Sequence, residues 1–259
     1  MAHTGLRFAQ DKGPGYSSNT SPAERIQDLQ TFYGLRKWGF VLYRCTYGDD
    51  ERWHRFLARL TKHRDAVLRD HYHLPALVDS HDWAVQDDAS LNGATRDEVR
   101  RRFRRWVAAD AAAEIPAGVD DSTKAGLMRE SPRYNYCVLV DAEAMSSVLQ
   151  QAPVLGGEDG PVTGHVTLIR ADEDWDLPDF DRFDWSKHQA SHVTTDIEGD
   201  DEGEDEYDEG EPALEGSRLR DAGWMRVAVD SLVLETYATL TKSFMWDKLY
   251  CRPPKVMER

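Results

Sequence analysis

WGFVLYRCTY, residues 38–47, is an apolar run rich in aromatic and β-branched residues, and two later stretches of the chain echo it. The echoes are YNYCVLVD at residues 134–141 and WMRVAVD at residues 224–230. Residues of these types favour strands, and each run leads through an acidic turn into a helical pattern. The sequence therefore predicts an α+β domain with a sheet at its centre.

Helical patterns follow these runs and open on identifiable caps. Pro22 suits the first helical position and predicts a helix over residues 22–31. After the turn at residues 48–50, apolar residues at helical spacing indicate a longer helix, and Thr95 with Glu98 forms the capping box of another. The expected buried stripes are Trp53, Phe56, Leu57, Leu60, Val67 and Leu68 in the first of these two helices and Val99, Phe103, Trp106 and Val107 in the second.

The expected sheet combines these runs with further strands at residues 83–86 and 165–170 and an edge strand at residues 244–251. Residues 111–132 lose periodicity and indicate a loop or a frayed helix end. A V-x-V-D step into a helix occurs twice, in VLVDAEAMSSV and VAVDSLVLETY. Two such strand–helix–strand units predict a ferredoxin-like arrangement. We expect a mainly antiparallel sheet with helices packed on one face.

A long acidic insertion, residues 172–222, interrupts this domain. The formal net charge of the chain is −15, and eleven of its acids lie in residues 196–211, which contain no Lys or Arg. Low hydrophobicity with high net charge favours disorder, so we expect the insertion to be at least partly disordered. The remaining organisation is a flexible tail at residues 1–21, a single α+β domain over residues 22–254 and a C-terminal tail at residues 255–259.

The insertion also places large rings among its acids, at Trp175, Phe180, Phe183 and Trp185. Such a composition is typical of a segment that orders on a partner protein, and we interpret these four residues as candidate partner-binding residues. The alternative is that the rings pack back on the domain. The purely acidic run is either a solvated linker or a contact for a basic partner.

Arginines within the predicted strands indicate a second kind of site. Arg44 and Arg226 are predicted to lie on the same strand face as apolar neighbours. An arginine buried in a sheet must be paired. They either form ion pairs with Asp or Glu, or hold an anionic ligand in a pocket on an open sheet face. The candidate ligand-binding residues are Tyr43, Arg44, Arg133, Asn135 and Arg226.

Other patterns argue against several classes of function. Five arginines within residues 100–105 form a basic cluster, but the chain outside the acidic run is nearly neutral, so we expect no nucleic-acid binding. The histidines clustered at residues 71–81 and 188–192 lack the Cys or carboxylate spacing of a metal site, so no metal is expected. The sequence has no GxSxG, Walker A, GxGxxG or HExxH motif, and it predicts no cofactor and no particular reaction.

The cysteines and the apolar runs indicate the compartment. Cys45, Cys137 and Cys251 lie in or beside apolar runs without a CxxC motif, which favours a reducing environment. The N-terminus lacks the apolar region of a secretory signal, and no apolar stretch approaches the ~20 residues that span a bilayer. We expect a cytoplasmic protein, with the nucleus as the alternative, and no membrane association.

Several short sequence motifs occur in order along the chain: GFVLYRCTYGDDERWHRFL, EVRRRFRRWV, RYNYCVLVDAEAM, GWMRVAVDSLV and YCRPP. They resemble a widespread family of uncharacterised proteins of filamentous fungi, whose members have words such as GFVIYRCTY and WMKVAVDSL around an acidic insertion. The resemblance runs in patches from Trp38 to Pro254. It implies no activity, cofactor or catalytic residue.

Two functions from different classes follow from these patterns. The first is an intracellular, non-catalytic interaction or regulatory protein that contacts an unknown protein partner through the acidic–aromatic insertion. The alternative is a small-molecule-binding protein or enzyme with a pocket on the sheet face, lined by strand arginines and tyrosines.

Overall fold

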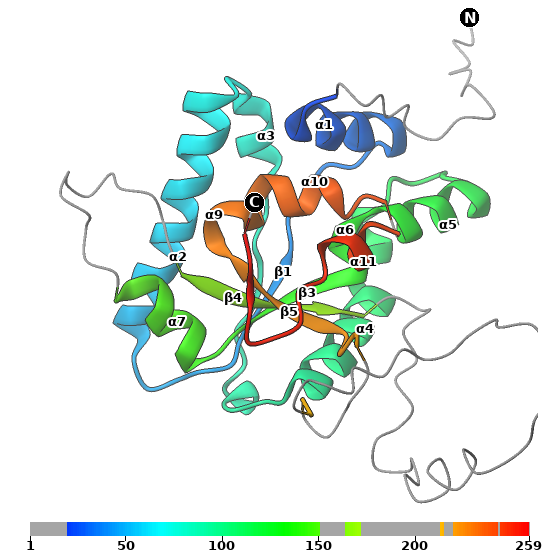
Figure 1. The fold of residues 1–259 in the computed structure, drawn as a ribbon. Helices are drawn as coiled ribbons and strands as arrows, with labels where there is room; N and C mark the ends of the chain where they lie inside the picture. Colours follow the sequence, from blue (N-terminus) through cyan, green and yellow to red (C-terminus); the bar gives the residue numbers. More distant parts are fainter. Residues whose placement is uncertain (1–19, 151–163, 172–212, 215–219, 243, 259) are drawn as a thin grey trace, which may run out of the picture.

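The structure is a computed structural model that describes residues 20–150, 164–171, 213–214, 220–242 and 244–258 (Figure 1). Most of the expected N-terminal tail and of the acidic insertion lies outside these residues. The described part is an α+β arrangement with a central sheet, as the sequence predicts.

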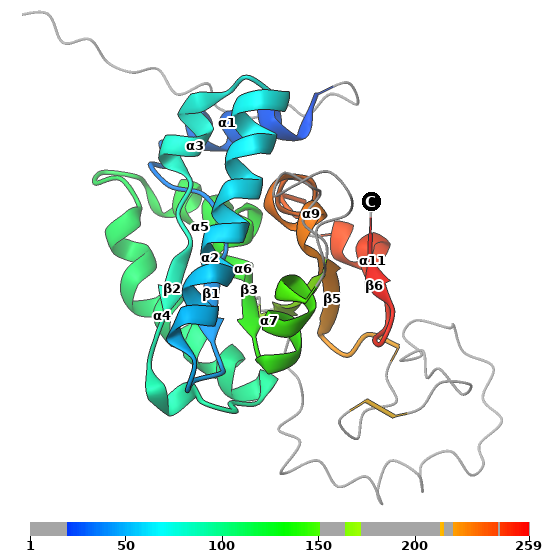
Figure 2. The same ribbon diagram turned by 90° about the vertical axis from the view of Figure 1, so that its left-hand side faces the viewer.

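Six strands form one sheet in the described part of the chain, in the order β2-β1-β3-β4-β5-β6. Figure 2 shows them running from β2 on one side of the molecule to β6 on the other. Strand β1 pairs in parallel with both β2 and β3, β4 is antiparallel to both of its neighbours, and β5 pairs in parallel with β6. The strands are β1 (Val41–Arg44), β2 (Ala84–Gln86), β3 (Tyr136–Val140), β4 (His165–Arg170), β5 (Trp224–Ala228) and β6 (Val256–Met257).

Helices cover both faces of this sheet, with α2 and α7 on one side and α4 on the other (Figure 1). The helical elements are α1 (Pro22–Tyr33), α2 (Asp50–Asp65), η1 (Ala66–His71), α3 (Pro75–Ser80), η2 (Ala89–Leu91), α4 (Arg96–Glu114), α5 (Asp121–Glu130), α6 (Pro132–Asn135), α7 (Ala142–Leu149), α9 (Val229–Ser231), η3 (Leu232–Thr236), α10 (Tyr237–Thr239) and α11 (Met245–Leu249).

The larger core lies on the face covered by α1, α2, α7 and the helical segment 229–239. Its sheet side is a row of directly opposed residues, Leu42, Val138, Leu168 and Met225, each fully buried. The predicted α2 stripe meets this row, and Trp53, Phe56 and Leu60 are buried in the same cluster. Even and odd residues of β1 enter different cores, because successive side chains of a strand point to opposite faces of the sheet.

The second core lies between the opposite face of the sheet and α4. Tyr43 and Leu139 are neighbours across β1 and β3, and both pack in one cluster with Val99 and Phe103 of α4. The Thr95 hydroxyl accepts the Glu98 N–H at 3.2 Å, as expected for the predicted start of this helix. Helix α4 is therefore held against the carboxyl-terminal half of β1.

The sheet differs from the expected one in its pairing and its covering. Three of its five strand pairings are parallel, so it is not mainly antiparallel, and both faces carry helices. Parallel neighbours need a crossover, and the chain supplies it with α2 to α3 between β1 and β2 and with α4 to α6 between β2 and β3. The ferredoxin-like topology is not confirmed.

Two further predictions at the end of the chain are corrected. Residues 244–251, expected as an edge strand, contain helix α11, because Trp246 and Leu249 are spaced for one helical face and are both buried. The expected tail from residue 255 contains β6, which supplies the edge of the sheet beside β5. Residues 111–132, expected as a loop or a frayed helix end, contain the end of α4, which extends to Glu114, and α5, which begins after the Asp120 cap.

Candidate functional site

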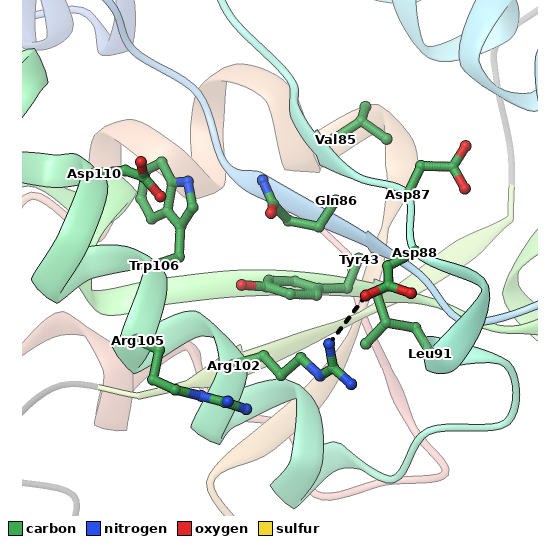
Figure 3. Close-up of a pocket in the computed structure, with 10 residues that line it drawn as sticks. All are labelled: Tyr43, Val85, Gln86, Asp87, Asp88, Leu91, Arg102, Arg105, Trp106 and Asp110. Carbon is green, nitrogen blue, oxygen red and sulfur yellow. Dashed lines mark hydrogen bonds and ion pairs between the residues drawn. The ribbon is translucent and has the colours of Figure 1, made fainter.

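A hollow of about 530 Å³ opens between α4 and the carboxyl ends of β1 and β2. We call it the α4 hollow. It is lined by Tyr43, Val85, Gln86, Asp87, Asp88, Leu91, Arg102, Arg105, Trp106 and Asp110 (Figure 3). Its volume falls within the range of small-molecule sites, ~300–1,000 Å³.

Its position follows from the path of the chain. Strands β1 and β2 are adjacent and parallel, but β1 leads into α2 on one face and β2 leads into α4 on the other. The hollow therefore lies outside the carboxyl ends of two parallel strands, and it is at this end of the strands that ligands bind in open α/β sheets.

Tyr43 forms the floor of the hollow. Its side chain is 2% exposed, and its hydroxyl has no hydrogen-bond partner among the described residues. Figure 3 shows the hydroxyl pointing into the space between Gln86 and Trp106. Burial raises the pKa of the Tyr43 phenol, against the opposing effect of Arg102 and Arg105, so the hydroxyl keeps its proton at neutral pH.

Three of the charged residues around the hollow have partners. Arg102 lies 3.2 Å from the Asp88 carboxylate and also contacts Ser90 and Glu98. Asp87 accepts a hydrogen bond from Arg44 at 3.2 Å. These contacts fix the rim where η2 leads from β2 towards α4.

Two charged residues at the other side of the hollow have no such partner. Arg105 and Asp110 are exposed on α4, and neither forms an ion pair within the described part of the chain. The Arg105 Nε donates a long hydrogen bond, 3.4 Å, to the Arg101 carbonyl of its own helix. The hollow therefore offers one guanidinium and one carboxylate to a ligand.

Trp106 stands between these two charges and supplies an aromatic wall. Its ring stacks on Phe103, with centroids 6.0 Å apart, and on Tyr134, with centroids 6.5 Å apart. The Arg133 guanidinium lies 5.6 Å from the centre of the same ring. Contacts on several sides fix the orientation of the indole.

The structure does not bring the five predicted ligand-binding residues together. Only Tyr43 lines the hollow. Arg44, on the opposite parity of β1, is 4% exposed and pairs with Asp50 and Asp87, while its guanidinium lies over the rings of Tyr47 and Trp53. Of the two predicted alternatives for Arg44, an ion pair with Asp or Glu and a bound anionic ligand, the ion pair describes its contacts.

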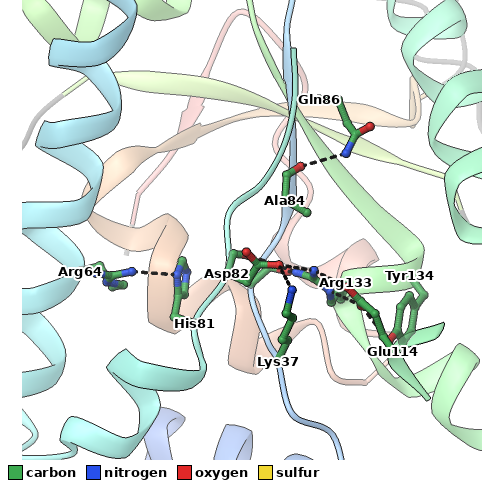
Figure 4. A network of polar contacts seen from close by, with 10 residues as sticks. Lys37, Arg64, His81, Asp82, Ala84, Gln86, Glu114, Arg133 and Tyr134 are labelled. Atoms are coloured by element: carbon green, nitrogen blue, oxygen red, sulfur yellow. Dashed lines mark hydrogen bonds and ion pairs between the residues drawn. The ribbon is translucent and has the colours of Figure 1, made fainter. Parts of the chain in front are cut away.

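Arg133 belongs to a buried polar network at the amino-terminal end of the parallel strands (Figure 4). It forms a bidentate ion pair with Glu114 and contacts the Asp82 carboxylate at 2.7 Å. Its Nη1 donates to the carbonyls of Gly39 and Asp82 at 3.0 and 3.1 Å. These partners come from α4 and from the segments that lead into β1 and β2. Arg133 therefore links α4 to the sheet.

Asn135 and Arg226 also have structural partners. The Asn135 amide donates to the carbonyls of Met128, Arg129 and Ser131 and so caps the end of α5. Arg226 on β5 pairs with Glu143 of α7 at 2.8 Å. The candidate partner-binding residues Trp175, Phe180, Phe183 and Trp185 lie outside the described residues.

Sequence reasoning missed the residues that α4 contributes. Arg102, Arg105, Trp106 and Asp110 follow the spacing i, i+3, i+4, i+8, which is one helical face. The arginines of this face were interpreted as part of a basic cluster, and Trp106 as part of a buried stripe. The combination of both charges and an indole on one helical face was a sequence signal for a binding site.

Among the residues that the structure describes, no group of three or more His, Cys, Asp or Glu side chains could hold a metal ion. Within the same residues no helix has the length and apolar character needed to cross a bilayer. No family model, no curated protein and no solved structure matches the chain.

Proposed function

We propose that the protein binds a small polar molecule in the α4 hollow. The observation that carries this proposal is the buried Tyr43 hydroxyl, which points towards the hollow (Figure 3) and has no hydrogen-bond partner among the described residues. A buried hydroxyl left unsatisfied costs ~1–3 kcal/mol. A ligand that accepts its proton would remove that cost.

The surroundings of Tyr43 support binding more than a purely structural role. The hollow combines apolar contacts from Val85 and Leu91 with the unpaired charges of Arg105 and Asp110. A few convergent polar groups in a partly apolar concavity are the usual composition of a small-molecule site. The hollow also lies at the carboxyl ends of the parallel strands β1 and β2, the end at which ligands bind in open α/β sheets.

Retention of metabolites by the purified protein tests this function. The full chain is equilibrated with a complex metabolite extract, separated from free solute, denatured, and its bound molecules are identified by mass spectrometry. We expect one class of compound to be retained by the wild type and by Arg101→Glu, whose exposed side chain does not line the hollow. Retention should fall at least tenfold in Arg105→Glu and in Tyr43→Phe.

Equal retention by Arg105→Glu and the wild type would contradict the proposal, as would the absence of any retained compound. Circular dichroism and thermal unfolding of each variant show whether it has folded. Because Tyr43→Phe removes a single oxygen atom that has no hydrogen-bond partner within the described residues, a loss of retention there reports on ligand contact.

A second candidate is the interaction function expected from the acidic–aromatic insertion. The composition of the insertion supports it, with Trp175, Phe180, Phe183 and Trp185 among its acids, whereas Leu214, near the end of the insertion, packs against the domain cluster that contains Tyr43 and Trp224. Deleting residues 175–212 and comparing captured partners and thermal stability tests it. Capture that is unchanged by the deletion would contradict this candidate. The similarity to the fungal family remains a proposal too, and it contributes no activity.

A further inference from the structure

Two charged residues of the hollow, one cation and one anion, have no ion-pair partner among the residues that the structure describes. Asp87, Asp88 and Arg102 are engaged in the ion pairs of the rim. Arg105 and Asp110 remain, and in the described part of the chain neither lies within ion-pair distance of the other or of a third charged group. They are five residues apart, which is ~7.5 Å along a helix axis.

The Tyr43 hydroxyl determines which end of a ligand lies near Arg105. It carries a proton, and the neighbouring guanidinium groups of Arg102 and Arg105 are donors that cannot accept it. A hydroxyl can donate or accept, but a ligand group that bridges Tyr43 and Arg105 must accept from the guanidinium, and it can then also accept the Tyr43 proton. An acceptor beside a guanidinium is most strongly bound when it is a carboxylate, because charge-assisted hydrogen bonds are roughly twice as strong as neutral ones.

The opposite end of the hollow is suited to a cation. The Asp110 carboxylate is an acceptor only, and the Trp106 ring lies between it and Arg105 (Figure 3). An ammonium group would be attracted by this carboxylate and would donate hydrogen bonds to it. Val85 and Leu91 supply apolar surface for the carbon skeleton between the two ends.

From this arrangement we infer that the ligand is a small zwitterionic amino-carboxylate. Its carboxylate lies at Tyr43 and Arg105, and its ammonium group lies at Asp110. The inference rests on the proposed binding function, and it adds the chemical class of the ligand.

Titration calorimetry with matched probes tests this class. L-phenylalanine and 6-aminohexanoate are zwitterions with a short and a long separation of charge. Each is compared with an analogue that lacks the ammonium group, 3-phenylpropionate or hexanoate, and with one that lacks the carboxylate, phenethylamine or hexylamine. We expect at least one zwitterion to bind, and both of its analogues to bind at least tenfold more weakly.

Single substitutions assign each end of the ligand. Asp110→Asn should abolish the preference for the zwitterion over its acid analogue, and Arg105→Gln should abolish the preference over the amine. Tyr43→Phe should weaken the zwitterion and the acid but leave the amine unchanged. Arg101→Gln, outside the hollow, is the matched control and should bind like the wild type.

Two results would overturn the inference. One is an analogue with a single charge that binds as tightly as its zwitterion. The other is that neither zwitterion binds. If metabolite retention in the same protein still depends on Arg105 and Tyr43, the binding function stands and only the ligand class is wrong.

Discussion

Arg133 and Glu114 form a bidentate ion pair, with Arg133 Nε 2.7 Å from Glu114 Oε2 and Nη2 2.8 Å from Oε1. The Arg133 side chain is completely buried, whereas Glu114 is the last residue of α4. The pair thus fixes the end of the helix that carries Arg105, Trp106 and Asp110. It links the buried network of Figure 4 to the hollow of Figure 3.

Glu114→Gln should therefore destabilise the protein strongly. Removing one member of a buried ion pair costs ~3–5 kcal/mol, because the other charge is left uncompensated. We expect a loss of about 3 kcal/mol, at the lower end of that range, since Asp82 still contacts Arg133. Chemical denaturation of the two proteins measures the difference.

Lys37→Met provides the control for this substitution. Lys37 also pairs with Asp82, at 3.2 Å, but its side chain is 52% exposed. Exposed pairs contribute ~0–1 kcal/mol, so this variant should be nearly as stable as the wild type. Similar losses in the two variants would show that burial does not determine the strength of the network.

His81 should make the protein sensitive to mild acid. Its ring is buried in contact with the rings of Trp38 and Trp83, and Arg64 Nη1 lies 3.3 Å from its Nδ1. Burial, helped by the nearby charges of Arg64 and Arg133, lowers the pKa of His81 well below its ordinary value. The histidine is therefore neutral in the folded protein.

The sign of the effect follows from the lowered pKa. Above the unfolded pKa of ~6.5 both states are neutral and His81 gives no pH dependence. Below it the unfolded state binds the extra proton, so stability should fall by ~1.4 kcal/mol per pH unit until the folded pKa is reached. His81→Phe should lose this slope, whereas replacing the exposed His54 should retain it. Identical slopes between pH 6.5 and pH 5 in His81→Phe and the wild type, measured by denaturation at each ~0.5 pH step, would contradict this assignment.

Gly39 should tolerate no side chain. Its φ is +112°, and a Cβ at this position would lie 2.8 Å from the Asp82 carbonyl oxygen and 3.0 Å from His81 Nε2. Gly39→Ala therefore combines backbone strain of ~1–3 kcal/mol with a clash against backbone that pairs with Arg133. Gly48 has a similar φ, +98°, with nothing near its Cβ position, so Gly48→Ala isolates the strain. We expect Gly39→Ala to lower the melting temperature well beyond Gly48→Ala, and equal losses would show that space at Gly39 is not limiting.

Periodicity and caps made many of the helices and strands predictable. The Trp53 to Leu60 stripe, the Thr95–Glu98 cap and the alternation of Leu42 and Tyr43 each depend on residues close in sequence. Strand direction was not predictable in this way, because it depends on which face each crossover covers. The C-terminal error has a simpler cause: Trp246 and Leu249 were assigned to a strand although their spacing suits one helical face.

The candidate site was predictable only in part. Tyr43 was predicted as a neighbour of Arg44 in the first strand, but Arg105 and Asp110 reach the same hollow through the packing of α4, some sixty residues away along the chain. Arginines in or beside the strands misled the prediction, because such an arginine gives the same sequence pattern whether it meets a ligand or a carboxylate of the protein. Arg44, Arg133 and Arg226 all meet carboxylates of the protein.

Arg44 gives the last test, because it holds Asp87 at the rim of the hollow and Asp50 at the start of α2. Its guanidinium, through hydrogen bonding and charge, keeps the pKa of Asp50 below the ordinary value for aspartate. Arg44→Met should return that pKa towards the ordinary value, which an NMR titration of the Asp50 carboxyl measures. In Arg44→Lys the pKa of Asp50 should be lowered only in part, because an ammonium lacks the planar fork that reaches two carboxylates at once. An Asp50 pKa that is unchanged in Arg44→Met would mean that the ion pair does not form in solution. The rim at Asp87 would then need another anchor.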